Sequence, residues 1–142
     1  MKNTGQLFED RFKSWHKGLD KVMCIKYPDN KSSGSSREAI CDFLVLFRGM
    51  TAYIELKHTN NKVNFSFDLI KKHQLDKLLD IAWTDNPSFF LIENGFRELF
   101  LVTPQTILGY IKAGKKSIKF IDLGYCRIDK EHYLKYLKNK KN

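Results

Sequence analysis

The sequence predicts a mixed α/β fold, in which α-helices flank a central mixed β-sheet. The elements follow the order helix, three strands, helix, two strands, helix, which favours a sheet covered by helices. Two hairpin signals, Arg48-Gly49 and Asn94-Gly95, lie between apolar runs. The 142 residues are 42% hydrophobic and 13% aromatic, which suits a folded globule with one core. We therefore expect a single domain over residues 1–142.

The N-terminal part is expected to hold one helix and one strand. A helix is predicted over residues 4–19, because large apolar side chains recur there at helical spacing. Asn3 can cap this helix, with Gln6 three residues later completing a capping box. A short strand over residues 22–27 and a polar loop over 28–37 follow.

The next segment reads as an apolar hairpin. Its strands are expected at about residues 39–47 and 51–57, joined by a two-residue turn. Gly49 supplies the positive φ that a tight hairpin needs. With that turn, Phe47 pairs with Met50.

Counting back from this pair brings two acids and a lysine together. Asp42 lies directly opposite Glu55, and cross-strand partners have Cβ atoms roughly 5 Å apart. Lys57 is two residues further along the strand, so it points to the same face. Facing carboxylates repel unless a cation lies between them, and hard cations such as Mg²⁺ prefer oxygen ligands. The alternative is an exposed acid beside an ordinary Glu–Lys pair.

The central part of the chain is expected to form a helix and a second hairpin. A polar loop over residues 58–66, including a solvated His58, leads to a helix over 67–82. The apolar runs 88–92 and 99–102 flank the Asn-Gly pair and are predicted to be hairpin strands.

Three elements are expected near the C-terminus. Thr103 and Pro104 begin a helix as its cap and first residue, and Gly114 ends it. A short strand over 117–121 precedes a basic C-terminal helix and tail over about 129–142.

The charge points to a polyanionic partner. With 25 Lys and Arg against 16 Asp and Glu, the formal net charge is +9, and nucleic acid is the leading candidate. The alternative is a basic protein with solvated lysines. No apolar run approaches the ~20 residues that span a membrane, and the start of the chain lacks a signal-peptide core. Three scattered cysteines fit a reducing compartment, so we expect a cytoplasmic protein of a bacterial, archaeal or phage-infected cell.

An aspartate followed, after a gap, by Glu-x-Lys is the active-site pattern of the PD-(D/E)xK nucleases. Within that superfamily the chain resembles the Holliday-junction resolvases, both RecU-like and archaeal-resolvase-like, over about residues 3–123. The resemblance rests on Gly5-x-x-x-Glu9 in the first helix, the loop Ser32–Arg37, Asp42, Glu55-x-Lys57 followed by Thr59, Phe65-Ser66-Phe67, and His73-Gln74.

This resemblance implies a restriction-endonuclease-like core whose Glu-x-Lys strand is central. It also implies a metal-dependent, structure-selective endonuclease that resolves four-way DNA junctions by paired phosphodiester hydrolysis. From the residues alone, Glu9 would be a solvated helix residue, and Gln74 could equally be a surface amide. The catalytic residues that the resemblance implies are Glu9, Asp42, Glu55, Lys57 and Gln74.

Mg²⁺ is the expected cofactor, with Mn²⁺ as a substitute. Asp42 and Glu55 are its expected ligands, together with the backbone carbonyl of Leu56, and Glu9 is a candidate for a further one. The Ser- and Gly-rich loop could contact phosphate or could be merely flexible. The expected DNA contacts are Ser33, Ser35, Arg37, Thr59 and Lys62.

Symmetric cutting of a two-fold junction calls for two sites, so we expect a homodimer. The aromatic-rich segments 65–67 and 89–102 are the predicted contact surface. The alternative is that their paired phenylalanines, Phe65 with Phe67 and Phe89 with Phe90, belong to the core. Two other functions stay open: another PD-(D/E)xK nuclease of restriction or repair type, or a non-catalytic basic module that binds nucleic acid.

Overall fold

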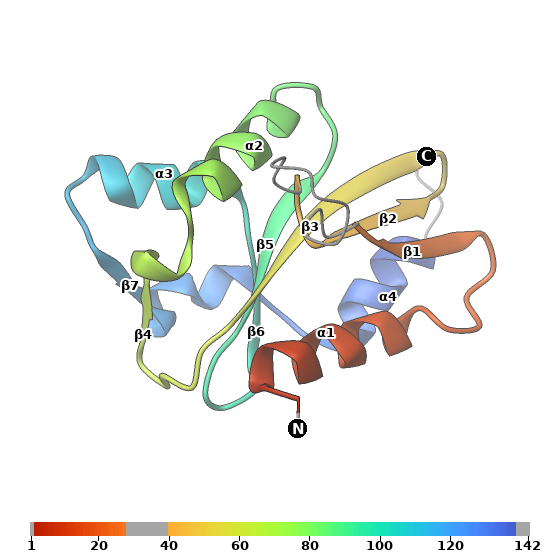
Figure 1. Cartoon of the computed structure of the whole chain (residues 1–142), viewed down its shortest axis with the longest axis horizontal. Helices are drawn as coiled ribbons and strands as arrows, with labels where there is room; N and C mark the ends of the chain where they lie inside the picture. Colours follow the sequence, from red (N-terminus) through yellow and green to blue (C-terminus); the bar gives the residue numbers. More distant parts are fainter. Residues whose placement is uncertain (1, 28–39, 139–142) are drawn as a thin grey trace.

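The structure, a computed structural model, describes residues 2–27 and 40–138 (Figure 1). Within these residues the main element is a mixed six-stranded sheet, which confirms the predicted fold class. Its strands, in spatial order, are β1 (Val22–Lys26), β2 (Phe43–Phe47), β3 (Met50–His58), β5 (Ser88–Glu93), β6 (Leu99–Val102) and β8 (Arg127–Ile128). β3 and β5 run parallel, whereas the other neighbours run antiparallel. The Glu-x-Lys strand β3 therefore lies inside the sheet, as expected.

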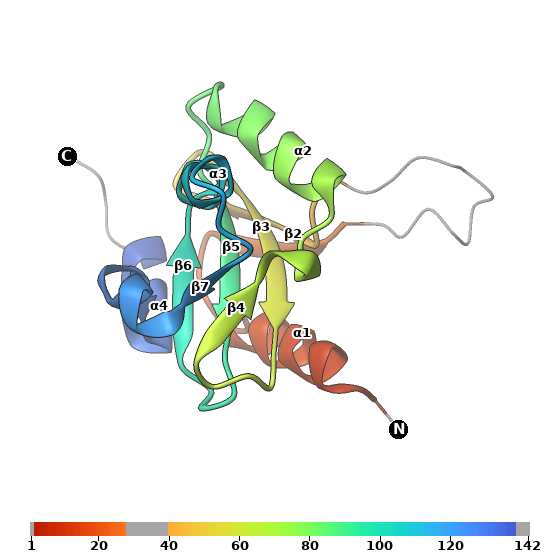
Figure 2. The same cartoon turned by 90° about the vertical axis from the view of Figure 1, so that its left-hand side faces the viewer.

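Helices cover both faces of this sheet, as Figures 1 and 2 show. They are α1 (Thr4–Trp15), α2 (Lys72–Ala82), α3 (Pro104–Lys112) and α4 (Lys130–Lys138). The buried side chains of α1 and α4 share one core cluster with one face, and those of α2 and α3 share another with the opposite face. The functional residues of β3 consequently face either α2 or α1, in alternation along the strand.

The β2–β3 hairpin has the predicted two-residue turn. Arg48 and Gly49 have φ values of 49° and 74°, the positive values that a type I′ turn requires. Phe47 pairs with Met50, and Phe43 pairs with Ile54. The register predicted from the sequence is therefore confirmed.

Two predicted helices differ from the structure at their ends. α1 stops at Trp15 instead of residue 19, because the chain turns there and Gly18 adopts a positive φ of 77°. The helix predicted over 67–82 begins instead with a separate 3-10 turn, η2 (Phe67–Leu69), that Ser66 caps. Ile70 then becomes extended, with φ of −106°, so α2 starts anew at Lys72.

The predicted loop over 58–66 contains an unexpected strand. β4 (Asn64–Ser66) pairs antiparallel with β7 (Ser117–Lys119) in a small second sheet, seen in front of the larger one in Figure 2. The strand predicted over 117–121 is therefore shorter, and a 3-10 segment, η3 (Phe120–Cys126), follows it. The final helix begins after Asp129, whose carboxylate accepts a hydrogen bond of 2.7 Å from the backbone N–H of His132.

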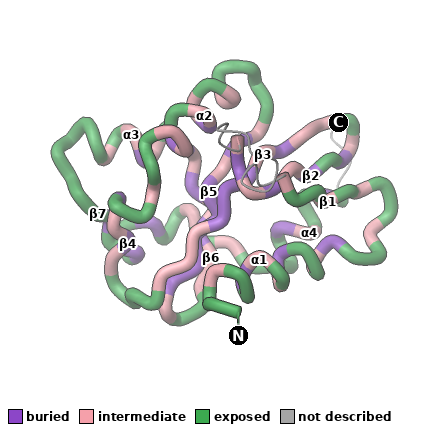
Figure 3. Tube along the Cα trace, viewed as in Figure 1, coloured by how far each residue is buried: buried purple, intermediate pink, exposed green. Residues whose placement is uncertain are grey.

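Most of the aromatic side chains in the segments predicted as a dimer contact lie in the core. Phe65, Phe90 and Phe100 are 0%, 0% and 2% exposed. Figure 3 shows the burial concentrated along the central strands. These side chains pack against α2, α3 and η3 and are not available for a dimer contact, whereas Phe96, in the same hairpin, is exposed.

Over residues 2–27 and 40–138, the structure has no helix with the length and apolar character needed to cross a membrane.

Two glycine substitutions should change stability in opposite directions. Gly49→Ala places a Cβ at a positive φ and should lower the free energy of unfolding by about 1 kcal/mol. Gly109 is an exposed residue of α3, and open space surrounds the position of a Cβ there. Gly109→Ala should therefore raise the free energy of unfolding by about 0.5–1 kcal/mol. Urea unfolding of both variants measures the two changes, and a stable Gly49→Ala protein would contradict the strained turn.

Candidate active site

Asp42 and Glu55 lie side by side, as the hairpin register predicts. Asp42 stands just before β2, and its Oδ2 accepts a hydrogen bond of 2.9 Å from the backbone N–H of Leu56 on β3. Lys57 lies on the same face of β3, with its Nζ 3.6 Å from Glu55 Oε2. The two acids and the lysine therefore form the compact cluster that the sequence predicts.

Gln74 joins this cluster from α2. Its Oε1 accepts hydrogen bonds from Lys57 Nζ at 2.8 Å and from the backbone N–H of Lys71 at 3.0 Å. Its Nε2 donates to Glu55 Oε2 at 3.1 Å. The amide is thus turned toward the acids instead of lying free on the surface, and it links the lysine to the buried carboxylate.

Glu9 reaches the cluster through a residue that the sequence analysis missed. Its carboxylate forms an ion pair with Lys26, whose Nζ lies 3.8 Å from Asp42 Oδ1. Lys26 pairs with Phe43, next to Asp42, so the β1–β2 register brings it there. Burial of the ammonium acts to lower the pKa of Lys26, but Glu9 and Asp42 outweigh it and hold that pKa above its usual value.

The Glu55 carboxylate lies in an unfavourable electrostatic position. Glu55 is 4% exposed. Its burial, and next the charge of the nearby Asp42, raise the pKa of Glu55 from 4.5 to about 8. The positive charge of Lys57 acts in the opposite direction. A positive charge between the two acids would relieve this cost. The facing oxygens of Asp42 and Glu55 therefore fit a hard divalent cation.

The available donors set limits on such a site. In the described part of the chain, no group of three or more His, Cys, Asp or Glu side chains could hold a metal ion. Two carboxylates with one backbone carbonyl leave positions for water or a phosphate oxygen, as Mg²⁺ prefers. Glu9 is bound to Lys26, which lies between it and Asp42.

Three of the predicted DNA contacts, Ser33, Ser35 and Arg37, lie outside the described residues. Thr59 and Lys62 lie in the loop after β3. Thr59 donates its backbone N–H to the carbonyl of Glu93 at 3.0 Å, and its hydroxyl accepts from Asn61 at 3.1 Å. Lys62 is exposed and close to Phe96.

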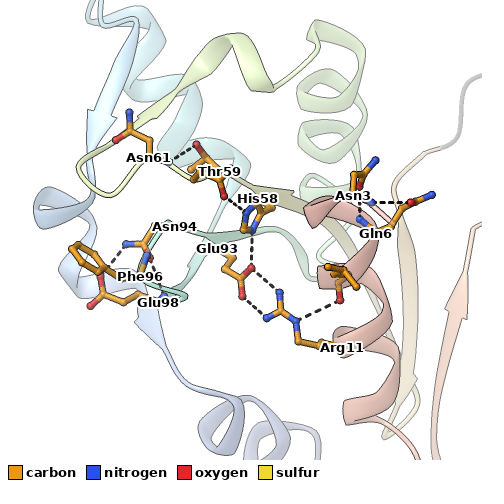
Figure 4. A network of polar contacts seen from close by, with 12 residues as sticks. Asn3, Gln6, Arg11, His58, Thr59, Asn61, Glu93, Asn94, Phe96 and Glu98 are labelled. Atoms are coloured by element: carbon orange, nitrogen blue, oxygen red, sulfur yellow. Dashed lines mark hydrogen bonds and ion pairs between the residues drawn. The ribbon is translucent and has the colours of Figure 1, made fainter. Parts of the chain in front are cut away.

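A second polar network lies on the opposite face of β3, where the sequence predicts only a solvated His58 (Figure 4). Glu93 on β5 is 2% exposed and accepts two hydrogen bonds from the guanidinium of Arg11, at 2.8 and 2.9 Å. His58 Nδ1 lies 2.7 Å from Glu93 Oε1. His58 therefore belongs to β3 and is half-buried. The sequence did contain a signal for this: His58 follows Lys57 in a strand whose side chains alternate, so it must point to the opposite face of the sheet.

The acid–lysine cluster beside the central strand has the arrangement that the resemblance to PD-(D/E)xK nucleases predicts. The sequence profile of the family Recombination protein U, RecU, matches residues 20–141. The chain therefore belongs to the RecU family, which confirms the resemblance noted from the sequence. The profile match begins after α1, so it does not include Glu9.

The fold is similar to that of a solved archaeal protein. The Holliday junction resolvase Hjc of Archaeoglobus fulgidus superposes with a TM-score of 0.53, over 71% of this chain and 78% of Hjc, at 13% sequence identity. A comparison with curated protein sequences gave no match.

The raised pKa of Glu55 predicts a pH-dependent stability in the absence of divalent metal. Below about pH 4.5 the Glu55 carboxyl is protonated in the folded and in the unfolded chain, so the free energy of unfolding does not change with pH through this group. As the pH rises toward about 8, the unfolded chain releases this proton while the folded chain retains it, so the free energy of unfolding falls.

Glu55→Gln removes this titration and should show a weaker decline over the same range. Urea unfolding in EDTA at several pH values measures both proteins. Superimposable pH profiles would show that Glu55 does not carry the shift.

Proposed function

We propose that the chain is a metal-dependent endonuclease that resolves four-way DNA junctions by paired phosphodiester hydrolysis. The observation that carries this proposal is the cluster of Asp42, Glu55 and Lys57, held by Gln74, on the central strand of a RecU-family chain. The similar fold of Hjc, a Holliday junction resolvase, supports it. A net charge of +9 suits a DNA substrate.

Phosphodiester hydrolysis needs a positioned water, a way to deprotonate it, and stabilisation of negative charge in the transition state. Mg²⁺, or Mn²⁺ in its place, supplies Lewis acidity when bound. Asp42 and Glu55 would hold the ion together with the Leu56 carbonyl. The oxygens of these two acids are already adjacent, so little rearrangement is needed to bind it.

Lys57 acts on the reacting groups in this proposal, and Gln74 positions it. The Lys57 ammonium orients the attacking water or offsets the charge that develops on the phosphate. Gln74 fixes the position of this ammonium, because its side-chain amide accepts a hydrogen bond from Lys57 and donates one to Glu55. Gln74 is thus a positioning residue for both groups.

Glu9 and Lys26 occupy the other side of Asp42. Lys26 lies between the two carboxylates, so it restrains the orientation of Asp42 and neutralises part of its charge. We propose that Glu9 acts on the site through this lysine and contributes negative charge beside the metal ligands.

A cleavage assay tests the proposal. End-labelled four-way junction, linear duplex and single strand are each incubated with Mg²⁺, with Mn²⁺ and with EDTA. We expect cleavage of the junction only with metal, and a loss of at least about 100-fold in Asp42→Asn, Glu55→Gln and Lys57→Ala. Junction binding should persist in these variants, because affinity comes mainly from the spread of basic residues.

Asp76→Asn is the matched control, since it makes the same carboxylate-to-amide change at an exposed position on α2 and should cleave normally. Equal cutting of duplex and junction would leave a nuclease without junction selectivity. Near wild-type turnover by Glu55→Gln would overturn the proposed site.

We further propose a homodimer in the cytoplasm. Paired incisions on a two-fold junction require two sites, and a C2 pair of subunits supplies them. The free thiols of Cys24, Cys41 and Cys126 suit a reducing compartment. Light scattering at micromolar concentration, with and without junction DNA, should give the mass of two subunits. A monomer in both conditions would favour a nicking nuclease instead.

A further inference from the structure

The turn between β5 and β6 exposes a large aromatic side chain. Phe96 is 61% exposed at the tip of this turn. The ammonium of Lys62, from the loop after β3, lies 5.1 Å from the centre of its ring. A cation at this distance stabilises the ring where it stands and leaves it accessible.

Hydrogen bonds hold the turn rigidly (Figure 4). The wholly buried side chain of Asn94 accepts hydrogen bonds from the backbone N–H groups of Phe96 and Glu98, at 3.0 and 2.9 Å. Its amide also donates to Glu98 Oε1 at 2.9 Å. The exposed ring is therefore presented by a preorganised turn, which lowers the entropy cost of a contact made through it.

The same turn is attached to the loop that follows the candidate active site. The backbone N–H of Gly95 donates to the carbonyl of Asn61 at 3.0 Å. A Cβ at position 95 would lie 2.2 Å from the Asn60 carbonyl oxygen, so only glycine permits this approach. Asn60 is three residues past Lys57, within about 10 Å along an extended chain. Phe96 therefore lies beyond the ends of β3 and β5 toward which the chain runs from Lys57 and its strand partner Ile92.

The surroundings of Phe96 are basic. Lys62 lies over the ring, Arg97 follows it in the sequence, and both are exposed. Within the turn, the carboxylate of Glu98 forms an ion pair of 2.8 Å with Arg127. An aromatic ring among cations fits a nucleic acid better than an apolar protein surface, because bases stack on the ring while lysine and arginine contact phosphates.

We infer that Phe96 stacks on a base that becomes exposed at the branch point of the DNA junction, with Lys62 and Arg97 contacting the flanking phosphates. This inference rests on the proposed function. A continuous duplex hides the faces of its bases, whereas a branch point offers them, so the contact distinguishes branched DNA from duplex. Stacking of one base on an aromatic side chain contributes about 1–3 kcal/mol.

Binding measured in EDTA tests the contact without any cleavage. Phe96→Ala should weaken junction binding by about 5- to 150-fold, which is that stacking energy expressed as a ratio, and should leave duplex binding unchanged. Phe96→Trp should retain affinity. Phe96→Leu keeps an apolar side chain without a π-face and should bind as weakly as Phe96→Ala.

Trp83→Ala is the matched control, because Trp83 is an aromatic residue, 86% exposed, at the far end of α2. It should bind junction normally. A junction with 2-aminopurine at the branch point reports stacking directly: its fluorescence should be quenched by the native protein and by Phe96→Trp, but not by Phe96→Leu. Thermal melting verifies that each variant folds.

Several outcomes would overturn the inference: native affinity in Phe96→Ala, an equal loss on duplex and junction, or a Phe96→Leu protein that binds and quenches like Phe96→Trp. None of these results would affect the proposed function, which is tested separately by metal-dependent cleavage and by its loss in Glu55→Gln. If the native protein bound no junction at all, the proposed function and this inference would fail together. If Phe96→Ala did not fold, the comparison of Phe96→Leu with Phe96→Trp would decide.

Discussion

The arrangement of α1 on the sheet depends on one buried carboxylate, that of Glu93. A charge so deeply buried is costly unless it is paired and fully hydrogen-bonded, and Arg11 and His58 satisfy it together. Arg11 belongs to α1, so this pair sets the rotation of the helix about its axis. Because successive helical residues are about 100° apart, Glu9 then points away from Arg11 and meets Lys26 on β1. An ion pair on the interior strand β5 thus helps to determine where Glu9 stands beside the edge strand β1.

The acid–lysine cluster is not optimised for stability. Asp42 and Glu55 face each other in a partly dry site, and Glu55 bears most of the cost. Lys57, Lys26 and Gln74 reduce this cost without removing it. An arrangement of this kind is common where a site is organised for a ligand, since stability is lost at the site and recovered elsewhere in the core.

The sequence predicted those parts of the site that local rules determine. A two-residue turn and strict alternation fix a hairpin register, so the opposition of Asp42 and Glu55 could be counted directly. Lys26 and Glu93 were missed because their neighbours are set by pairings between distant strands, which no local pattern records. The strand that contains Phe65 was missed for the same reason: its partner strand, β7, lies some fifty residues later, at Ser117–Lys119.

The spacing of these contacts along the chain has a consequence for synthesis. Asp42 meets Leu56 across 14 residues, and Glu55 meets Gln74 across 19, whereas Arg11 and Glu93 are separated by 82. Short loops close at low entropic cost and form early. A chain emerging from the ribosome can therefore assemble the acid–lysine cluster while Arg11, on the helix made first, still lacks Glu93. The ion pair that ties α1 to β5 is consequently the last of these three contacts to form.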